Sequence, residues 1–372
     1  MYEQGFQGDV FYMMLYAAVA AMSLIACCYL LLRRGNAFAT DITPPVRLRR
    51  WTAAFFAAIT LCHLWYLPTY FLTSSDERMQ GYLIAGLLDC MTVIPLTIII
   101  LLVMLQDRRR PLWPVCAMVI PLIVGRAWCV VNRSEDLNPM LFAYFTLMSI
   151  ALVIYIIRAT RQYSRWLRDN FADLEHKEVW QSFVLLAVIL LTFTIYSFDM
   201  GGLAYEYAME VNIIILIGYL LWRVETLIDL GISLQQDFPS AEIVLHDLAD
   251  AEYLERSSSA SENIDSLLQK YCIDTRLYLQ HDLTLLQLAK AIGTNRFYLS
   301  QYFSRQGTTY NAYINGLRID HFVTLYHQTV AAKQNFTVRK LAQESGYRNY
   351  ATFSNAFKQR MGKSASAWMQ EV

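Results

Sequence analysis

The sequence has few charged residues and lacks the motifs of common enzymes. Only 17% of its 372 residues are charged and 56% are hydrophobic, a balance unlike that of an ordinary soluble protein. Histidine occurs six times, and there is no HExxH metalloprotease motif, no phosphate-binding Walker motif and no GxGxxG dinucleotide motif. We therefore expect a protein that is not an enzyme and that uses no cofactor and no metal.

Cysteine is present without a pattern that would give it a chemical role. The seven cysteines include no CxxC pair, which argues against a zinc or redox site. Six of them lie in long apolar runs: Cys27, Cys28, Cys62, Cys90, Cys116 and Cys129. In such runs a thiol packs like a small hydrophobic side chain. We expect packing residues rather than disulfides or metal ligands.

The long hydrophobic runs are confined to the first 223 positions. A bilayer span needs about 20 apolar residues. Seven segments meet or approach that length: 10–32, 52–72, 82–105, 113–131, 140–157, 180–198 and 208–222. The first could instead be a signal peptide, but the leader Met1–Asp9 is acidic and has no Lys or Arg, whereas a signal peptide begins positive. The sequence thus predicts a seven-helix transmembrane bundle.

Basic residues between the spans predict the orientation of this bundle. Alternate connections hold fourteen Lys and Arg residues, and the others hold only Arg78 and Arg133. Cytoplasmic loops carry the excess of Lys and Arg, so the N-terminus is predicted outside and everything after Arg223 in the cytoplasm. Because the outside loops are short, a signal would be a small molecule, a membrane component or a partner protein at the outer face.

Asp89 and Arg126 are charged residues inside predicted spans. They lie roughly 10 Å and roughly 8 Å from the outer ends of the third and fourth spans, at a rise of about 1.5 Å per residue. A charge without a partner in lipid is unfavourable, and intramembrane charges are usually paired or functional. We predict that the two form an ion pair, either a structural brace or an element that a signal breaks.

Two copies of one pattern occupy the C-terminal region. Each copy has a Leu-Ala pair, a Gly four residues after the Ala, and then two apolar residues four apart on a second helix. The copies are Leu288-Ala289, Gly293, Leu299 and Phe303, and Leu341-Ala342, Gly346, Phe353 and Phe357. A small residue where helices cross, a Gly where the chain turns with positive φ and two apolar residues that seat a second helix predict tandem helix-turn-helix units.

These residues resemble the DNA-binding domain of the AraC/XylS family over about 265–370. Between the two units lies the connector Asn311–Gln328 with the pattern Tyr-Ile…Leu-Arg-Ile, and the chain differs from the family at Phe322 and at Ser364-Ala365. The resemblance implies an all-α domain that binds double-stranded DNA with the second helix of each unit in the major groove. Thr284 and Gln287 predict a capping box at the start of the first unit.

The resemblance and the facing of the helices give a set of expected DNA contacts. The inward positions of each second helix leave the remaining side chains to face the groove. Expected base contacts are Phe297, Ser300, Gln301, Tyr350, Ala351, Ser354 and Asn355, and expected backbone contacts are Arg305, Arg348 and Lys358. Gln and Asn suit the edge of adenine, and Phe297 or Ala351 suits a thymine methyl.

The sequence therefore predicts three regions, and the two soluble ones carry net charges of opposite sign. They are a transmembrane domain at 1–223, an acidic cytoplasmic linker at 224–262 and an AraC-like domain at 263–372. From Lys270 onward there are 13 Lys and Arg against 5 Asp and Glu, whereas 224–269 has 1 against 10. A basic domain suits nucleic acid. The acidic stretch is either a solvated linker or a competitor of DNA for the basic domain.

We interpret the chain as a sequence-specific transcription regulator in the inner membrane of a bacterium, which couples a membrane or periplasmic signal to gene expression. The competing hypothesis is a membrane receptor or transporter-like protein whose C-terminal helical domain is only a protein-interaction module. The expected partners are double-stranded DNA and the lipid bilayer. The sequence leaves open a homodimer, a small-molecule or protein signal at the outer face and, for an activator, RNA polymerase.

Overall fold

The computed structural model describes residues 10–33, 44–108, 110–174, 177–198, 203–230 and 259–371, with the side chains of 193–198, 203 and 259–263 excepted. Within these ranges every regular element is a helix, and the one β-type contact is an isolated bridge between Phe171 and Thr284. The predicted all-α class is therefore confirmed for the described residues. The chain divides into two compact units, 1–163 with 179–231, and 164–178 with 232–372.

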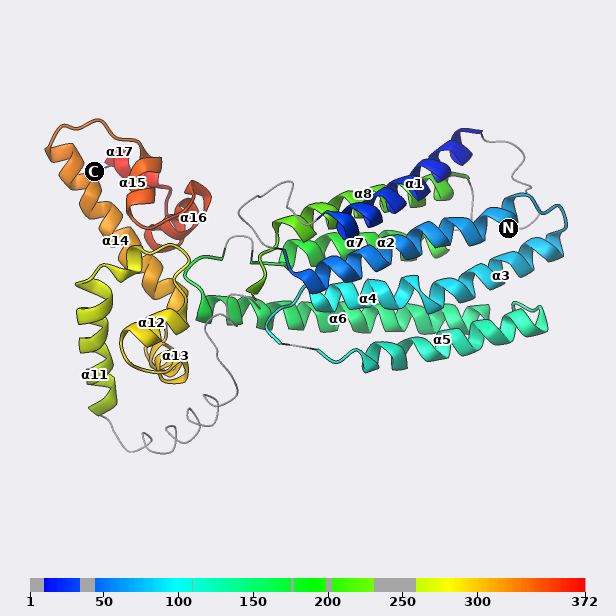
Figure 1. Cartoon of the computed structure of the whole chain (residues 1–372), viewed down its shortest axis with the longest axis horizontal. Coiled ribbons are helices and arrows are strands. Elements are labelled where there is room, and N and C mark those ends of the chain that lie inside the picture. The colour runs from blue at the N-terminus through cyan, green and yellow to red at the C-terminus, as the bar shows by residue number, and fades with distance from the viewer. Residues whose placement is uncertain are drawn as a thin grey trace. The chain divides into compact units, whose positions relative to one another are not determined.

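The first unit is a bundle of long helices (Figure 1). α1 packs against α2 and α8, α3 packs against α5, and α2 packs against α4. The bounds are α1 Val10–Leu32, α2 Val46–Tyr66, η1 Leu67–Tyr70, α3 Ser75–Met91, α4 Val93–Val103, α5 Trp113–Asn132, α6 Asn138–Asn170, α7 Trp180–Phe198 and α8 Leu203–Thr226.

The third predicted span is divided into two helices, α3 and α4. The break falls at Thr92, whose backbone leaves the helical region at φ −124° and ψ −68°. Pro95 follows three residues later and has no N–H to donate to the preceding turn. At the break, the hydroxyl of Thr92 donates to the carbonyl of Leu88 at 2.7 Å. The missing N–H of Pro95 therefore accounts for a break in a segment that hydropathy alone predicts as one helix.

Six helical segments in the described ranges are long and apolar enough to cross a bilayer, with α3 and α4 counted together as Ser75–Val103 and α2 with η1 as Val46–Tyr70. They correspond to the predicted spans at 10–32, 52–72, 82–105, 113–131, 140–157 and 208–222. The remaining one, 180–198, corresponds to α7, of which Trp180–Thr192 counts as a shorter apolar helix. The composition of these helices is that of a membrane protein, and the count of seven spans stays a prediction.

The second unit contains the C-terminal helices (Figure 1). Two hydrophobic clusters form its core, one around each helix-turn-helix unit. The bounds are α11 Ser259–Leu268, the π-helical turn η2 Gln269–Ile273, η3 Leu277–Leu279, α12 Leu285–Ala291, α13 Arg296–Arg305, α14 Tyr310–Ala331, α15 Val338–Glu344, α16 Tyr350–Met361 and α17 Ala365–Glu371.

The first unit extends to 231 rather than 223, and the largest difference between the units and the sequence-based domains concerns one segment. The segment 164–178, which includes the end of α6, belongs with the C-terminal helices rather than with the helical bundle. Sequence order assigns this segment to a connection between two spans, because nothing in its local pattern indicates a distant partner. Most of the predicted acidic linker, 231–258, lies outside the described residues.

Candidate nucleic-acid interface

The first helix-turn-helix unit consists of α12 and α13 and begins with the predicted capping box. The hydroxyl of Thr284 accepts from the N–H of Gln287 at 3.2 Å, and the side chain of Gln287 accepts from the N–H of Thr284 at 3.0 Å. Gly293 turns the chain with φ of 75°. The side chain of Asn295 then caps α13 by accepting from the N–H of Tyr298 at 2.9 Å. Local sequence chemistry thus sets both helix starts.

The second unit, α15 and α16, repeats this geometry. Thr337 caps α15 by accepting from the N–H of Lys340 at 3.2 Å. Gly346 turns the chain with φ of 89°. Asn349 caps α16 by accepting from the N–H of Thr352 at 3.0 Å, and also accepts from the hydroxyl of Thr352 at 3.0 Å. The repeat predicted from the sequence is therefore a repeat of structure.

The apolar residues expected to seat the second helices are buried. Leu299 and Phe303 of α13, and Phe353 and Phe357 of α16, are at most 2% exposed. The small residues at the helix crossings are also buried, Ala289 at 0% and Ala342 at 1%. A side chain larger than a methyl group at either alanine would overpack the crossing of the two helices. The inward faces of both second helices are thus confirmed.

The opposite faces carry the residues expected to contact DNA. Eight of the ten are exposed, and Ser300 and Ser354 are half-buried; the exposed residues are Phe297, Gln301, Arg305, Arg348, Tyr350, Ala351, Asn355 and Lys358. Phe297 is 58% exposed, which is unusual for a large aromatic side chain without a partner surface. Exposure makes these side chains available to DNA, and their contacts with bases and phosphates stay predictions.

The connector helix α14 joins the two units through a buried arginine. Arg318 is 1% exposed, and its guanidinium donates to the carbonyls of Tyr278 at 2.8 Å and Gln280 at 2.7 Å. It also lies over the ring of Tyr347 at 5.5 Å from the centroid. Burial lowers the pKa of Arg318. One side chain therefore fixes the loop before the first unit and the turn of the second unit.

The two departures from the family pattern are accommodated in the core. Phe322 is fully buried, with its ring centroid 4.5 Å from that of Phe353 and 5.6 Å from that of Phe357. Ser364 caps α17 by accepting from the N–H of Ala367 at 3.2 Å, and Ala365 is buried. The substituted residues thus contribute packing and a helix cap at these positions.

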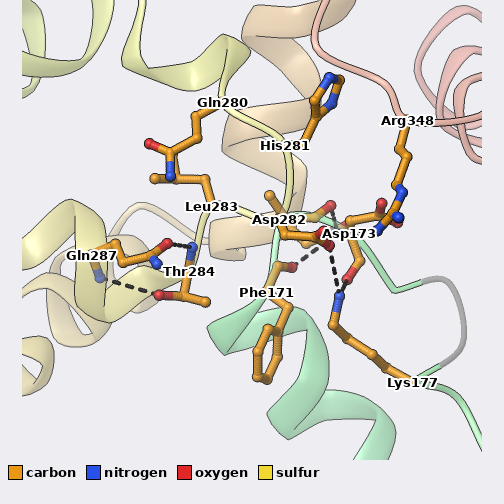
Figure 2. Close-up of polar contacts among 12 residues, drawn as sticks. Phe171, Asp173, Lys177, Gln280, His281, Asp282, Leu283, Thr284, Gln287 and Arg348 are labelled. Carbon is orange, nitrogen blue, oxygen red and sulfur yellow. Dashed lines mark hydrogen bonds and ion pairs between the residues drawn. The ribbon is translucent and has the colours of Figure 1, made fainter. Parts of the chain in front are cut away.

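Sequence reasoning missed a group of charges beside Arg348. Asp282 lies 3.6 Å from Arg348 and 3.2 Å from the ammonium of Lys177 (Figure 2). Asp282 also adopts φ of 54°, a conformation that Asp tolerates better than most residues. The sequence alone indicates Lys177 only as a positive charge in a loop, because no local pattern connects it to a residue 105 positions away.

In the first unit the predicted ion pair between Asp89 and Arg126 is wrong. The carboxylate of Asp89 accepts from the hydroxyl of Tyr66 at 2.9 Å and from the indole N–H of Trp65 at 3.3 Å. Arg126 donates to the side chain of Asn138 at 2.8 Å. Their depths in the spans are compatible with a pair, but neutral hydrogen-bonding groups on neighbouring segments satisfy each charge. The similar depths of Asp89 and Arg126 in their spans did not determine which side chains face one another.

A second buried polar pair in this unit was not predicted. The ring Nε2 of His63 lies 3.2 Å from a carboxylate oxygen of Glu210, and both residues are less than 5% exposed. The ring Nδ1 lies 2.8 Å from the carbonyl of Ile59, to which it must donate. A ring that donates from Nδ1 can hydrogen-bond a carboxyl group through Nε2 only when one of the two groups carries an additional proton. The pair therefore joins α2 and α8 through buried polar side chains.

Comparison with known proteins supports the assignment of the C-terminal helices. Residues 288–371 match the sequence model of a helix-turn-helix domain family, and this match extends from α12 to α17. No curated protein and no solved structure shows a significant match to the chain. The match covers the two units described above, including both turn glycines. The C-terminal part of this chain thus contains a helix-turn-helix domain, and the match supports a DNA-binding transcription regulator of the AraC type.

Proposed function

We propose that the chain is a membrane-embedded, sequence-specific transcription regulator and not an enzyme. The observation that carries this proposal is the pair of capped recognition helices, α13 and α16, whose outward faces present polar, basic and aromatic side chains. The six long apolar helices support membrane embedding. The basic charge of the C-terminal domain suits a polyanion.

In this proposal each recognition helix lies in the major groove. The two units joined by α14 contact successive grooves one helical turn apart, about 34 Å. Gln301 and Asn355 read base edges, with adenine as the preferred partner because an amide matches its donor and acceptor. Arg305, Arg348 and Lys358 bind phosphates, which fixes the register without reading sequence.

The test separates base-reading residues from phosphate-binding residues. Full-length protein in neutral detergent is used to select genomic fragments, and binding to the selected sites is then measured at several salt concentrations. Gln301→Ala and Asn355→Ala should each cost about 1–3 kcal/mol at selected sites and relax base preference there. Arg305→Ala and Lys358→Ala should weaken all sequences alike and reduce the salt slope by about one. Equal weakening of every sequence by the amide variants would disprove the proposed facing of the helices.

We further propose the inner membrane of a bacterium as the location, with the N-terminus outside and the DNA-binding domain in the cytoplasm. The fourteen basic residues in alternate connections support this orientation. Reporter fusions after Arg34, Arg110 and Arg223 should report cytoplasm, and fusions near Ser75 and Asn138 should report periplasm. A periplasmic result after Arg223 would reject the regulator hypothesis, because the domain would be separated from DNA.

A protein-interaction module is the competing function for the C-terminal domain. The exposed amides Gln301 and Asn355 and the family match favour DNA. An interaction module would bind no duplex in the selection above, at any salt concentration.

A further inference from the structure

The segment 164–178 is built into the hydrophobic core of the first helix-turn-helix unit. Phe171 and Ala172 are 2% and 1% exposed, and Ala172 belongs to the same core cluster as Leu283, Tyr310 and Ile314. This segment follows the apolar part of α6 along the chain without a break in the helix, which ends at Asn170. The DNA-binding domain thus has a core residue supplied by the connection between two candidate spans.

Backbone groups pair the segment with the start of the first unit. Phe171 and Thr284 form an antiparallel bridge, and the N–H of Ala172 donates to the carbonyl of Leu283 at 3.2 Å. Thr284 is the residue that caps α12. Strand-like pairing fixes the register of the segment to within one residue, because a shift by one would turn Ala172 away from the core.

Two amide side chains of α14 bind the other edge of the segment. Asn311 donates to the carbonyls of Phe171 at 3.2 Å and Ala172 at 2.7 Å, and Asn315 donates to the carbonyl of Ala172 at 3.2 Å. Residues four apart on a helix lie on one face. The connector therefore offers a polar cradle for a backbone carbonyl that would otherwise be buried without a partner.

Charges complete the contact next to a residue expected to bind phosphate. The ammonium of Lys177, 4% exposed, donates to the carbonyl of Asp173 at 2.8 Å and to the carboxylate of Asp282 at 3.2 Å. The other oxygen of Asp282 lies 3.6 Å from Arg348, whose side chain is 50% exposed (Figure 2). Asp282 is thus shared between a buried cation of the segment and an exposed cation of the second unit.

We propose that the 164–178 segment is the regulatory input of the DNA-binding domain. While it is docked, Lys177 and Arg348 share the charge of Asp282. When Lys177 moves away, Asp282 is left to Arg348 alone, which lowers the net positive charge beside the DNA. A signal acting on α6 would thereby change DNA affinity through the position of Lys177. This inference rests on the proposed function.

The test measures binding of full-length protein in neutral detergent to a fluorescein-labelled mixed-sequence duplex of about 40 base pairs at low salt. Lys177→Gln removes the charge and keeps a donor, and Arg168→Gln is the matched control because Arg168 is exposed in the same segment. We expect Lys177→Gln to weaken binding about fivefold more than the control does. Asp282→Asn should bind at least as tightly as wild type, and the double variant should bind within about twofold of Asp282→Asn.

Hydrogen exchange of the Ala172 amide reports docking independently of DNA. The amide should be protected in the wild type and should exchange faster in Asn311→Ala, which removes two hydrogen bonds to the segment. Asn311→Ala should also weaken duplex binding. Equal binding by Lys177→Gln and Arg168→Gln, or a defect that persists in the double variant, would overturn the regulatory role alone. A wild type that binds no duplex while Ala172 is protected would overturn the proposed DNA-binding function as well.

Discussion

The two helix-turn-helix units begin their helices with the same cap residues, Thr and Asn, and turn at a Gly with positive φ, but the two turns have different neighbours. A Cβ added at Gly293 would meet no atom within 4 Å, whereas one added at Gly346 would lie 2.9 Å from the backbone of Leu279. The carbonyl of Gly346 is also 3.1 Å from the ring of His281. The second turn therefore packs on the segment that precedes the first unit. The same Leu-Ala…Gly pattern thus has different packing neighbours in the two units.

The largest expected effect separates the two glycines. Gly346→Ala should cost about 3 kcal/mol or more, because a strained positive φ is combined with a clash against backbone that cannot rotate away. Gly293→Ala should cost only about 1 kcal/mol, since only the conformational strain applies. Hydrogen exchange of α13 in Gly293→Ala and of α16 in Gly346→Ala, each in the full-length protein, measures the two losses of stability. Similar losses at the two sites would mean that the second turn does not interlock with the first unit.

Removal of the two threonine caps should give a smaller difference in stability than the two glycine substitutions. Thr284→Ala removes a reciprocal capping box and should destabilise α12 by about 1.5 kcal/mol, whereas Thr337→Ala removes a single side-chain bond and should cost about 1 kcal/mol. Exchange rates of the amides in the first turns of α12 and α15 report the two losses. Serine at either position is the control and should retain most of the protection. A larger loss at Thr337 would reverse the ranking of the two caps.

The second helices are also held by different polar contacts. Tyr302 of α13 is mostly buried and its hydroxyl donates to Asp265 of α11, whereas Arg360 of α16 pairs with Asp320 of α14 at 2.7 Å with both side chains exposed. Tyr302→Phe should cost about 1 kcal/mol. Arg360→Gln should cost about 0.5 kcal/mol or less and should become neutral in high salt. Thermal unfolding at two salt concentrations distinguishes these behaviours.

The smallest expected effect is a pH dependence at the contact between α14 and the loop before the first unit. Burial and Arg276 lower the pKa of His321, while Glu344 raises it. The unfolded chain therefore binds more protons than the folded chain below about pH 6.5, so stability should fall as the pH drops below that value. Midpoints of thermal unfolding at pH 7.5 and 5.5 should differ less in His321→Gln than in wild type. If His321→Gln kept the full pH dependence of stability, a titratable group other than His321 would cause that dependence.

Much of the candidate interface could be predicted because its signals are short-range. The capping box at Thr284, the positive φ at Gly293 and Gly346 and the buried faces at Phe303 and Phe357 each depend on residues within one or two helical turns. The apolar helices followed from composition in the same way. The break at Thr92 was less evident, because a helix interrupted next to proline keeps the hydropathy of a continuous span.

The sequence by itself determined the kind of helices, their caps and the outward faces of the two recognition helices, since these are set by neighbours along the chain. Tertiary structure alone decided that Asp89 meets Tyr66 rather than Arg126, and that Asp282 lies between Lys177 and Arg348. Such pairings join residues far apart in sequence. The physical reason is that the packing of whole helices, rather than local propensity, brings particular side chains within the few ångströms over which hydrogen bonds form.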